Sequence, residues 1–369
     1  MANLSFTSVA AVAHIRRISF KYANSKYGLR PFATVPAYVY HPHVTILEGE
    51  KQAMHLTKSV FSTDPLPSTL PPIESLQSVA NELEGYIKDC IIQSRVYGYR
   101  EKIAKRDYHN ISLTQNMLRV LSTQAGKYPQ LLDRGLTYKP KISVNWKRNQ
   151  HRIAVTGCPG YLLSTPQPLT PFAHENEVKS TLNIPVQDLS PVSPVIDISE
   201  YSVRPDTAYG FHPGSPYPYP HTLFIVDRKT KSRPTSQMLS HGIMYNHAIL
   251  QAVAINILNM KAGQELDHPL AMNTIMTNGR MFAFIYYQLN TLNLQHDDGV
   301  KNLVWIKHTV PLFHKVKKKE GIIRFGQQCW QLWLSTVMNG IDLQDMSEDF
   351  RNFQQQYRGK NDQKMKAIA

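Results

Sequence analysis

Clusters of lysine and arginine are the residues whose type and spacing point most directly to chemistry, namely the binding of phosphate groups. Four clusters recur, at residues 102–106, 147–152, 228–233 and 315–324. On loops and hairpin tips such side chains reach phosphates without disturbing a core. The candidate RNA-binding residues are Lys147, Arg148, Arg152, Arg228, Lys229, Lys231, Arg233, Lys315, Lys317, Lys318 and Lys319. The alternative for each cluster is a solvated face that keeps the protein soluble.

The overall charge supports the same interpretation. Lys and Arg number 41 and Asp and Glu number 27, which gives a formal net charge of +14 over 369 residues. Such an excess favours a polyanionic partner, above all nucleic acid. The sequence has no RNP aromatic motif, KH loop or zinc finger, so we expect contacts with the RNA backbone and shape rather than with base sequence. A basic protein of an organelle matrix without such a partner is the alternative.

Signatures of catalysis are weak by comparison. The sequence contains no Gly-rich phosphate loop, dinucleotide fingerprint, zincin motif or GxSxG elbow, so it predicts no cofactor and no enzyme of those classes. Asp297 and Asp298 directly precede a glycine, and this pattern first of all predicts a turn. The competing hypothesis is a metal-dependent nuclease that uses these two carboxylates together with Asp267. The three cysteines are far apart and indicate neither a disulfide framework nor a zinc site.

Hydrophobic periodicity predicts the elements that must position these residues. Helical spacing occurs over 48–61, 73–99, 111–133, 236–260 and 326–338. Alternation predicts strands at 142–146, 153–155, 222–227, 270–277, 281–289 and 301–306, with an Asn-Gly hairpin turn at 278–279 in which both positions need positive φ. The expected fold class is α/β (α+β), with a mixed or antiparallel sheet packed by the long helices 73–99 and 236–260.

Two proline-containing segments have no periodicity. Residues 157–213 are rich in Pro, Ser and Thr, and we expect them to wrap over the body of the protein. Residues 214–221 follow as an arm, whose candidate protein-docking residues are Tyr217, Pro218, Tyr219, Pro220 and His221. Each proline fixes φ and removes a backbone donor, so the arm is expected to be neither helix nor central strand.

The chain is expected to divide into three parts. Residues 1–40 contain arginines and serines and no acid, which is typical of a mitochondrial targeting segment; a basic disordered tail is the alternative. Residues 41–345 form the body, with a helical part over 48–135 and a sheet-containing part over 140–345. Residues 346–369 form a polar tail. No apolar run is long enough to span a membrane.

Several stretches carry a family resemblance: LEGEKQA (47–53), PVSPVIDI (191–198), YPYPHTL (217–223), TNGRMF (277–282), QLNT (288–291) and GVKNLVW (299–305). Over about residues 44–310 the chain resembles the mitochondrion-specific large-subunit ribosomal protein thirty-seven family. The resemblance implies a structural constituent of the mitochondrial large ribosomal subunit that supports mitochondrial translation, with no catalytic residues.

The resemblance also implies partners. They are mitochondrial ribosomal RNA, other large-subunit proteins and a paralogous protein, once numbered thirty in the small subunit, as a heterodimer partner. Two alternatives stay open at this point. One is a mitochondrial RNA-acting enzyme, and the other is a matrix interaction protein that is not part of the ribosome.

Overall fold

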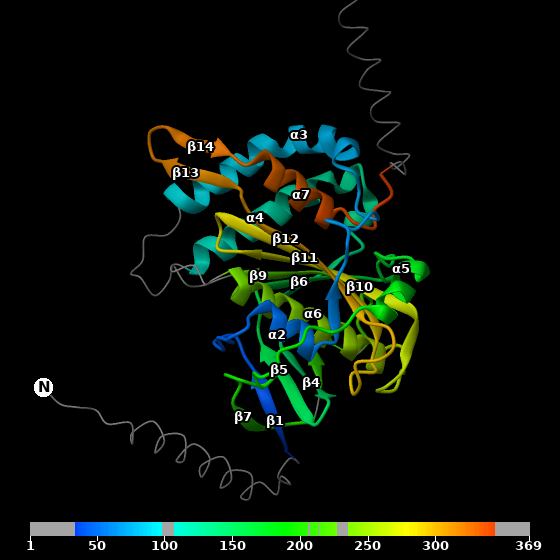
Figure 1. Ribbon diagram of the computed structural model, residues 1–369. Coiled ribbons are helices and arrows are strands. Elements are labelled where there is room, and N and C mark those ends of the chain that lie inside the picture. Colours follow the sequence, from blue (N-terminus) through cyan, green and yellow to red (C-terminus); the bar gives the residue numbers. More distant parts are fainter. Residues whose placement is uncertain (1–33, 98–106, 206, 213, 227–234, 344–369) are drawn as a thin grey trace, which may run out of the picture.

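The computed structural model describes residues 34–97, 107–205, 207–212, 214–226 and 235–343 (Figure 1). Their elements form layers: a layer of helices, a seven-stranded sheet, a central helix, and a five-stranded sheet. The predicted targeting segment up to residue 33 and the predicted tail at 346–369 lie outside the described residues.

The large sheet is mixed, which is one of the two arrangements that the sequence predicts. Parallel pairs join β9 to β10 and β2 to β12, and the other neighbours are antiparallel. Its strands in spatial order are β2 (Ser59–Phe61), β12 (Asn302–Pro311), β11 (Met281–Thr291), β10 (Glu265–Thr277), β9 (Tyr219–Val226), β6 (Tyr161–Thr165) and β3 (Gly135–Tyr138).

The position of strand β11, between two hydrophobic cores, explains why its sequence is almost continuously apolar. Phe284 and Tyr286 belong to the core beneath the helical layer, whereas Ile285 and Tyr287 belong to the core around the central helix. All four side chains have an exposed fraction of 0%. A strand buried on both faces needs apolar side chains at every position, because successive side chains point to opposite faces.

The β10–β11 hairpin confirms the Asn-Gly prediction, with one correction. Of the two turn residues, Gly279 alone takes a positive φ, at +82°. Asn278 instead accepts hydrogen bonds at its Oδ1 from the backbone N–H groups of Arg280 and Met281, at 3.1 and 3.0 Å. The side chain of Asn278 therefore closes the turn in place of a second left-handed residue.

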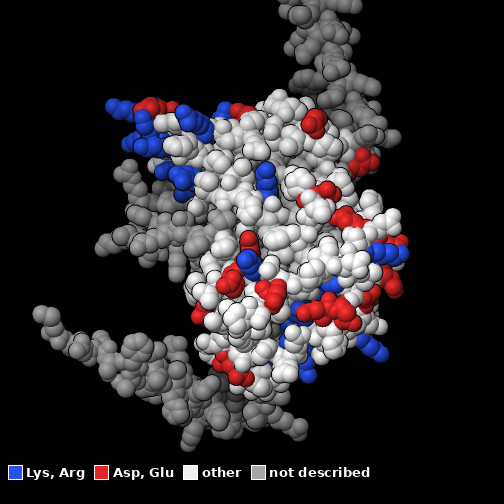
Figure 2. Space-filling model, in the orientation of Figure 1, with Lys and Arg blue, Asp and Glu red and all other residues white. Residues whose placement is uncertain are grey.

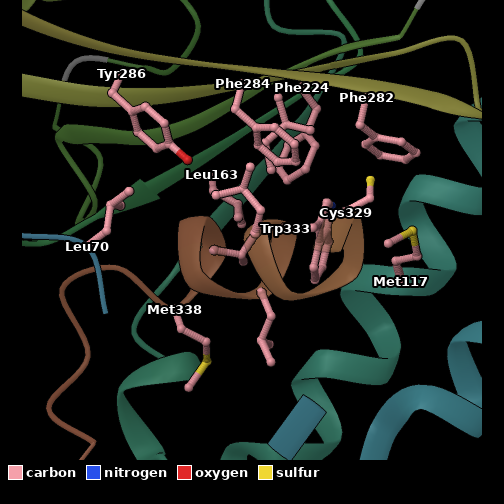
Figure 3. Close-up of a cluster of buried hydrophobic side chains, with 14 of the residues drawn as sticks. Leu70, Met117, Leu163, Phe224, Phe282, Phe284, Tyr286, Cys329, Trp333 and Met338 are labelled. Carbon is pink, nitrogen blue, oxygen red and sulfur yellow. The ribbon is translucent and has the colours of Figure 1, made fainter. Parts of the chain in front are cut away.

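The central helix α6 (Thr235–Asn256) lies between the two sheets and is buried along nearly its whole length. This position accounts for a helix that is apolar around its circumference. The helical layer on the other face of the large sheet contains α3 (Ile73–Ile92), α4 (Asp107–Ser122) and α7 (Gln327–Val337). Figure 3 shows Trp333 and Cys329 of α7 below Phe224 and Phe284 of the sheet.

The small sheet contains β7 (Glu200–Val203), β1 (Val35–Tyr40), β5 (His151–Gly157), β4 (Ile142–Arg148) and β8 (Ala208–Tyr209), in that order. The β4–β5 hairpin is confirmed. The sequence places residues 1–40 outside the body, whereas β1 pairs with β5 and buries Ala37, Val39 and Tyr40. The folded part therefore begins before residue 41, at β1.

Two further expectations are corrected. The predicted helix over 48–61 ends early: α2 covers Glu50–Leu56, and Lys58 takes a left-handed φ of 49° that breaks the helix before β2. The segment 157–213 does not only wrap over the body. It contains β6, which lies inside the large sheet, as well as α5 (Glu175–Ser180), β7 and β8. Among the described residues, no helix combines the length and the hydrophobicity that a membrane crossing requires.

Candidate nucleic-acid interface

A basic hairpin stands at one corner of the molecule. Strands β13 (Phe313–Lys317) and β14 (Gly321–Phe325) form a separate two-stranded sheet. Phe313 is buried against the helical layer, with Val316, Ile322 and Phe325 partly buried beside it. Lys315 and Lys317 flank the partly buried Val316, Lys318 and Lys319 occupy the tip, and all four lysines are exposed. The apolar side chains anchor the hairpin, so the exposed lysines are free to meet a partner.

Side chains from the helical layer enlarge this cationic surface. Lys88 of α3 places its Nζ 5.2 Å from the centroid of the Phe325 ring and also bonds Glu84 at 2.5 Å. Arg95, in the π-helical turn after α3, places its guanidinium carbon 5.8 Å from the centroid of the Phe313 ring. Both contacts are cation–π interactions that hold a positive charge against the hairpin.

The tip of the β10–β11 hairpin reaches the same corner. Arg95 donates from Nη2 to Asn110 Oδ1 at 2.8 Å, and a Cβ built on Gly279 would lie 1.9 Å from that nitrogen. The pKa of Arg95 is lowered from its ordinary value, first by burial and then by the positive charge of Arg280. Two guanidinium groups crowded in this way are well placed to gain from a bound phosphate.

We call this surface the basic corner. Its members are Lys88, Arg95, Arg280, Lys315, Lys317, Lys318, Lys319 and Arg324. Figure 2 shows the lysine and arginine side chains gathered there, over the β13–β14 hairpin. Sequence reasoning found the hairpin lysines but missed Lys88, Arg95 and Arg280. These three come from distant segments, and only the tertiary fold brings them together.

The other predicted RNA-binding residues lie elsewhere. Lys147 is exposed on β4, and Arg152 is half-buried and donates to Asn145 Oδ1 at 3.0 Å. Both belong to the small sheet, at the opposite end of the molecule from the basic corner (Figure 1). The cluster of Arg228, Lys229, Lys231 and Arg233 lies outside the described residues.

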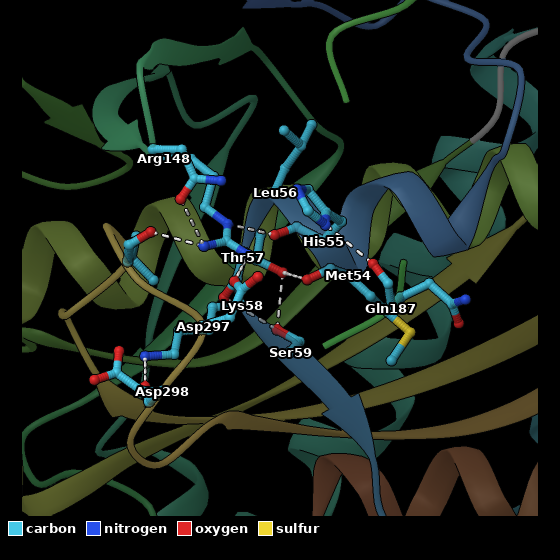
Figure 4. A network of polar contacts seen from close by, with 12 residues as sticks. Met54, His55, Leu56, Thr57, Lys58, Ser59, Arg148, Gln187, Asp297 and Asp298 are labelled. Carbon is cyan, nitrogen blue, oxygen red and sulfur yellow. Dashed lines mark hydrogen bonds and ion pairs between the residues drawn. The ribbon is translucent and has the colours of Figure 1, made fainter. Parts of the chain in front are cut away.

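Arg148 is a correction, because it is not a surface cation. Its side chain is 1% exposed. Its nitrogens donate to His55 O at 2.8 Å, to Leu294 O at 2.9 Å and to Asp297 Oδ1 at 2.5 Å (Figure 4). The guanidinium fork therefore joins α2 to the loop before β12, and it has no donor directed to solvent for RNA.

One carboxylate of the nuclease hypothesis, that of Asp297, takes part in the same network, whereas Asp298 contributes its backbone oxygen and Asp267 lies on β10. Burial raises the pKa of Asp297, but the hydrogen bond and the charge of Arg148 outweigh it, so that the pKa is lower than usual. Lys58 donates to the backbone oxygens of Asn293 and Asp298, at 2.8 and 2.5 Å. Among the residues that the structure describes, no group of three or more His, Cys, Asp or Glu side chains could hold a metal ion.

The predicted docking arm requires a second correction. Tyr219, Pro220 and His221 begin β9, which lies between β6 and β10 and is therefore a central strand. Pro220 is tolerated because the β6–β9 register shifts between Leu163 and Ser164, and an irregular position does not need the missing donor. Docking by Tyr217, Pro218 and Tyr219, which are half-buried, stays a prediction.

His221 itself is fully buried. Burial, followed by the charge of Arg134, holds the pKa of His221 well below its ordinary value, so the ring is neutral. Its Nε2 lies 2.8 Å from Asn339 O, which can only accept, and its Nδ1 lies 2.7 Å from the Thr222 hydroxyl. The Nε2–H therefore donates to Asn339, and Nδ1 accepts from Thr222. His221 joins β9 to the end of α7 and offers no surface to a partner.

Comparison with known proteins places this architecture in a family. The family described as "Mitochondrial 28S ribosomal protein S30 (PDCD9)" matches residues 152–340, which contain α6 and most strands of the large sheet. The chain is also similar to the large ribosomal subunit protein mL37 of several vertebrates. Identity is 30% to the protein of Rattus norvegicus, over 83% of this chain and 75% of the rat protein. For Bos taurus the values are 31%, 82% and 75%, and for Gallus gallus they are 27%, 82% and 74%.

Proposed function

Because the chain belongs to the mitochondrial ribosomal protein family that includes mL37, we propose that it is a structural constituent of the large subunit of the mitochondrial ribosome. One observation carries this conclusion: the similarity to mL37 extends over 83% of this chain and 75% of the rat protein. The family description names a small-subunit protein, but that match covers residues 152–340 alone. The longer similarity to large-subunit proteins therefore decides the subunit.

In this role the basic corner contacts ribosomal RNA. The support is physical: the lysines of the β13–β14 hairpin are exposed, and the hairpin is anchored by Phe313 and its partly buried apolar neighbours. Contacts of this kind neutralise phosphates without reading bases. Lys147 and Arg152 on the small sheet contribute a second, smaller contact. Arg148 does not, because it is buried.

Neighbouring ribosomal proteins are the other partners. We further propose that one of them is the paralogous protein, in a heterodimer. This proposal follows from the family resemblance alone; the matching family description, over residues 152–340, carries the name of a different ribosomal protein. Residues that precede the folded part direct the chain to mitochondria in this proposal, in line with their arginine-rich, acid-free composition.

Fractionation of mitochondria tests the function. The full chain, tagged at its carboxyl end, is expressed in cells, and mitochondrial lysate is separated on a sucrose gradient. We expect the protein to sediment with the large subunit and to move to light fractions when the ribosomal RNA is digested. A protein that stays in light fractions while the large subunit sediments without it would overturn the proposal in favour of a separate matrix protein.

A second measurement distinguishes the structural role from the hypothesis that the protein is a nuclease. The purified chain and its Asp297→Ala variant are incubated with mitochondrial RNA and Mg²⁺. We expect no cleavage by either protein. Cleavage that depends on Asp297 would favour the nuclease.

A further inference from the structure

Strand β3 is an open edge of the large sheet. In the part of the chain that the structure describes, β3 has one strand neighbour, β6. Lys139 N–H donates to Gly160 O at 2.9 Å, which fixes the ladder, since hydrogen-bonded and non-hydrogen-bonded pairs alternate along antiparallel strands. By this alternation the backbone N–H and C=O groups of Leu136 and Tyr138 point away from β6. They are therefore available to another strand.

The side chains of this edge are apolar and exposed. Leu136 is 48% exposed, Tyr138 is 50% exposed, and the preceding Leu132 is 67% exposed. Leu136 and Tyr138 pair with Leu163 and Tyr161 of β6, which are buried in the core beneath the helical layer. The apolar face of the sheet thus continues past the end of the helices that cover it. An apolar surface of this kind, on an unpaired edge, is typical of an interaction site.

Positive charge lies at one end of the edge. Lys139 and Lys141 are exposed just after β3. At its start, the guanidinium of Arg134 donates to the backbone oxygens of Val337 and Asn339, so it is turned into the protein. Asp133 is exposed beside it, so the end with the two lysines is the cationic one.

We propose that β3 binds an extended segment of a neighbouring protein of the large subunit, apolar at alternating positions and acidic at the end that meets Lys139 and Lys141. The proposal rests on the proposed function, which supplies such neighbours. A strand added beside β3 would pair the outward backbone groups of Leu136 and Tyr138 and cover their side chains. Its acidic end would lie near Lys139 and Lys141. The four residues of the strand, Gly-Leu-Thr-Tyr, carry no charge and no proline; the residues that usually protect an edge occur only after it, at Lys139, Pro140 and Lys141.

Thiol labelling within the ribosome tests this proposal. Cys90 and Cys329 are buried and Cys158 is exposed, so the Cys158→Ser background leaves no exposed thiol among the described residues. A Tyr138→Cys substitution in that background is labelled with a maleimide in the free protein and in the isolated large subunit. We expect labelling on the order of tenfold slower in the subunit, since an occupied edge must open before the thiol reacts. The protection should survive digestion of the RNA.

A backbone variant separates pairing from simple contact. Leu136→Pro removes an outward N–H without removing a hydrogen bond to β6, so the fold should persist, as circular dichroism would check. We expect retention in the large subunit to weaken about tenfold, which is the effect of losing about one interface hydrogen bond. The matched control is Phe61→Ser, which removes a side chain 45% exposed at the opposite edge of the same sheet.

The outcomes are distinct. Equal labelling of residue 138 in the free protein and in the subunit would overturn the proposal, and so would protection that disappears with the RNA. Cross-links from residue 138 to a second copy of this chain would also overturn it. If the chain does not sediment with the large subunit at all, the proposed function fails instead.

Discussion

The basic corner makes a quantitative prediction about salt. Lys318 and Lys319 lie at the tip of the β13–β14 hairpin and are exposed, whereas Lys317 is held by Glu320 at 2.8 Å. Replacing Lys318 and Lys319 by Ala should leave stability within about 0.5 kcal/mol, because both side chains are on the surface. The double variant therefore changes RNA binding without changing the fold.

The size of the effect follows from counterion release. Each lysine that neutralises one phosphate contributes about 0.7 to 0.9 to the slope of log K against log salt. The double variant should therefore lower the slope by about 1.4 to 1.8, and weaken binding at 0.1 M salt by a similar number of decades. Filter binding of the full chain to mitochondrial large-subunit RNA, from about 50 to about 200 mM salt, measures both quantities.

A matched control removes the same net charge elsewhere. Lys51 and Lys261 are exposed and lie outside the basic corner. Their double Ala variant should keep the wild-type slope. An equal loss of slope in both double variants would mean that net charge, not the corner, binds RNA. An unchanged slope for the hairpin variant would refute the assignment outright. In cells, charge reversal at Lys317, Lys318 and Lys319 should weaken association with the large subunit.

Three further predictions concern the fold. Arg148→Ala should lower the free energy of unfolding in urea by about 3 to 5 kcal/mol, because the backbone oxygens of His55 and Leu294 lose their donor. Asp297→Asn should lower it by about 1 kcal/mol or less, because Asp297 is 58% exposed. Because the pKa of Asp297 is lowered in the folded state, its carboxylate stabilises the fold above the unfolded pKa, and this stabilisation is lost as pH falls through the folded pKa. Urea unfolding measured at a series of pH values below about 5 should show the loss. The Asp297→Asn variant should lack this pH dependence. Gly279→Ala should lower the melting temperature more than Gly263→Ala, because both have positive φ but an added Cβ meets Arg95 at the former and nothing within 4 Å at the latter. Equal shifts would show that backbone strain alone matters.

Local patterns predicted the elements that are decided locally. The Asn-Gly hairpin, the helix α6 and the long helix α3 follow from turn chemistry and periodicity over neighbouring residues. The sequence left a mixed and an antiparallel sheet open. The sheet is mixed because the chain crosses over through α6 between β9 and β10, which makes these two strands parallel. The exact end of α2 does not follow, because β2 exists through its pairing with β12, which is far away in the sequence.

Among the site residues, too, those decided by local sequence were predicted and those decided by tertiary contacts were not. Lysines at a hairpin tip are exposed for local reasons, so sequence reasoning found them. Arg148 sits in a similar local sequence, but its partners come from α2 and from the loop before β12. His221 follows two prolines, yet the sheet accommodates them through a register shift. In each case the deciding contact is tertiary, and no short window of sequence contains it.

The pairing of β2 with β12 also has a consequence for biogenesis. It joins Ser59 to Asn302, so an edge of the large sheet cannot close until nearly the whole chain has left the translating ribosome. Closing so long a loop is slow, and during that time the apolar strands of the unfinished sheet are open to aggregation. Newly made chains should therefore depend on chaperones, and products truncated before residue 302 should be degraded rather than assembled.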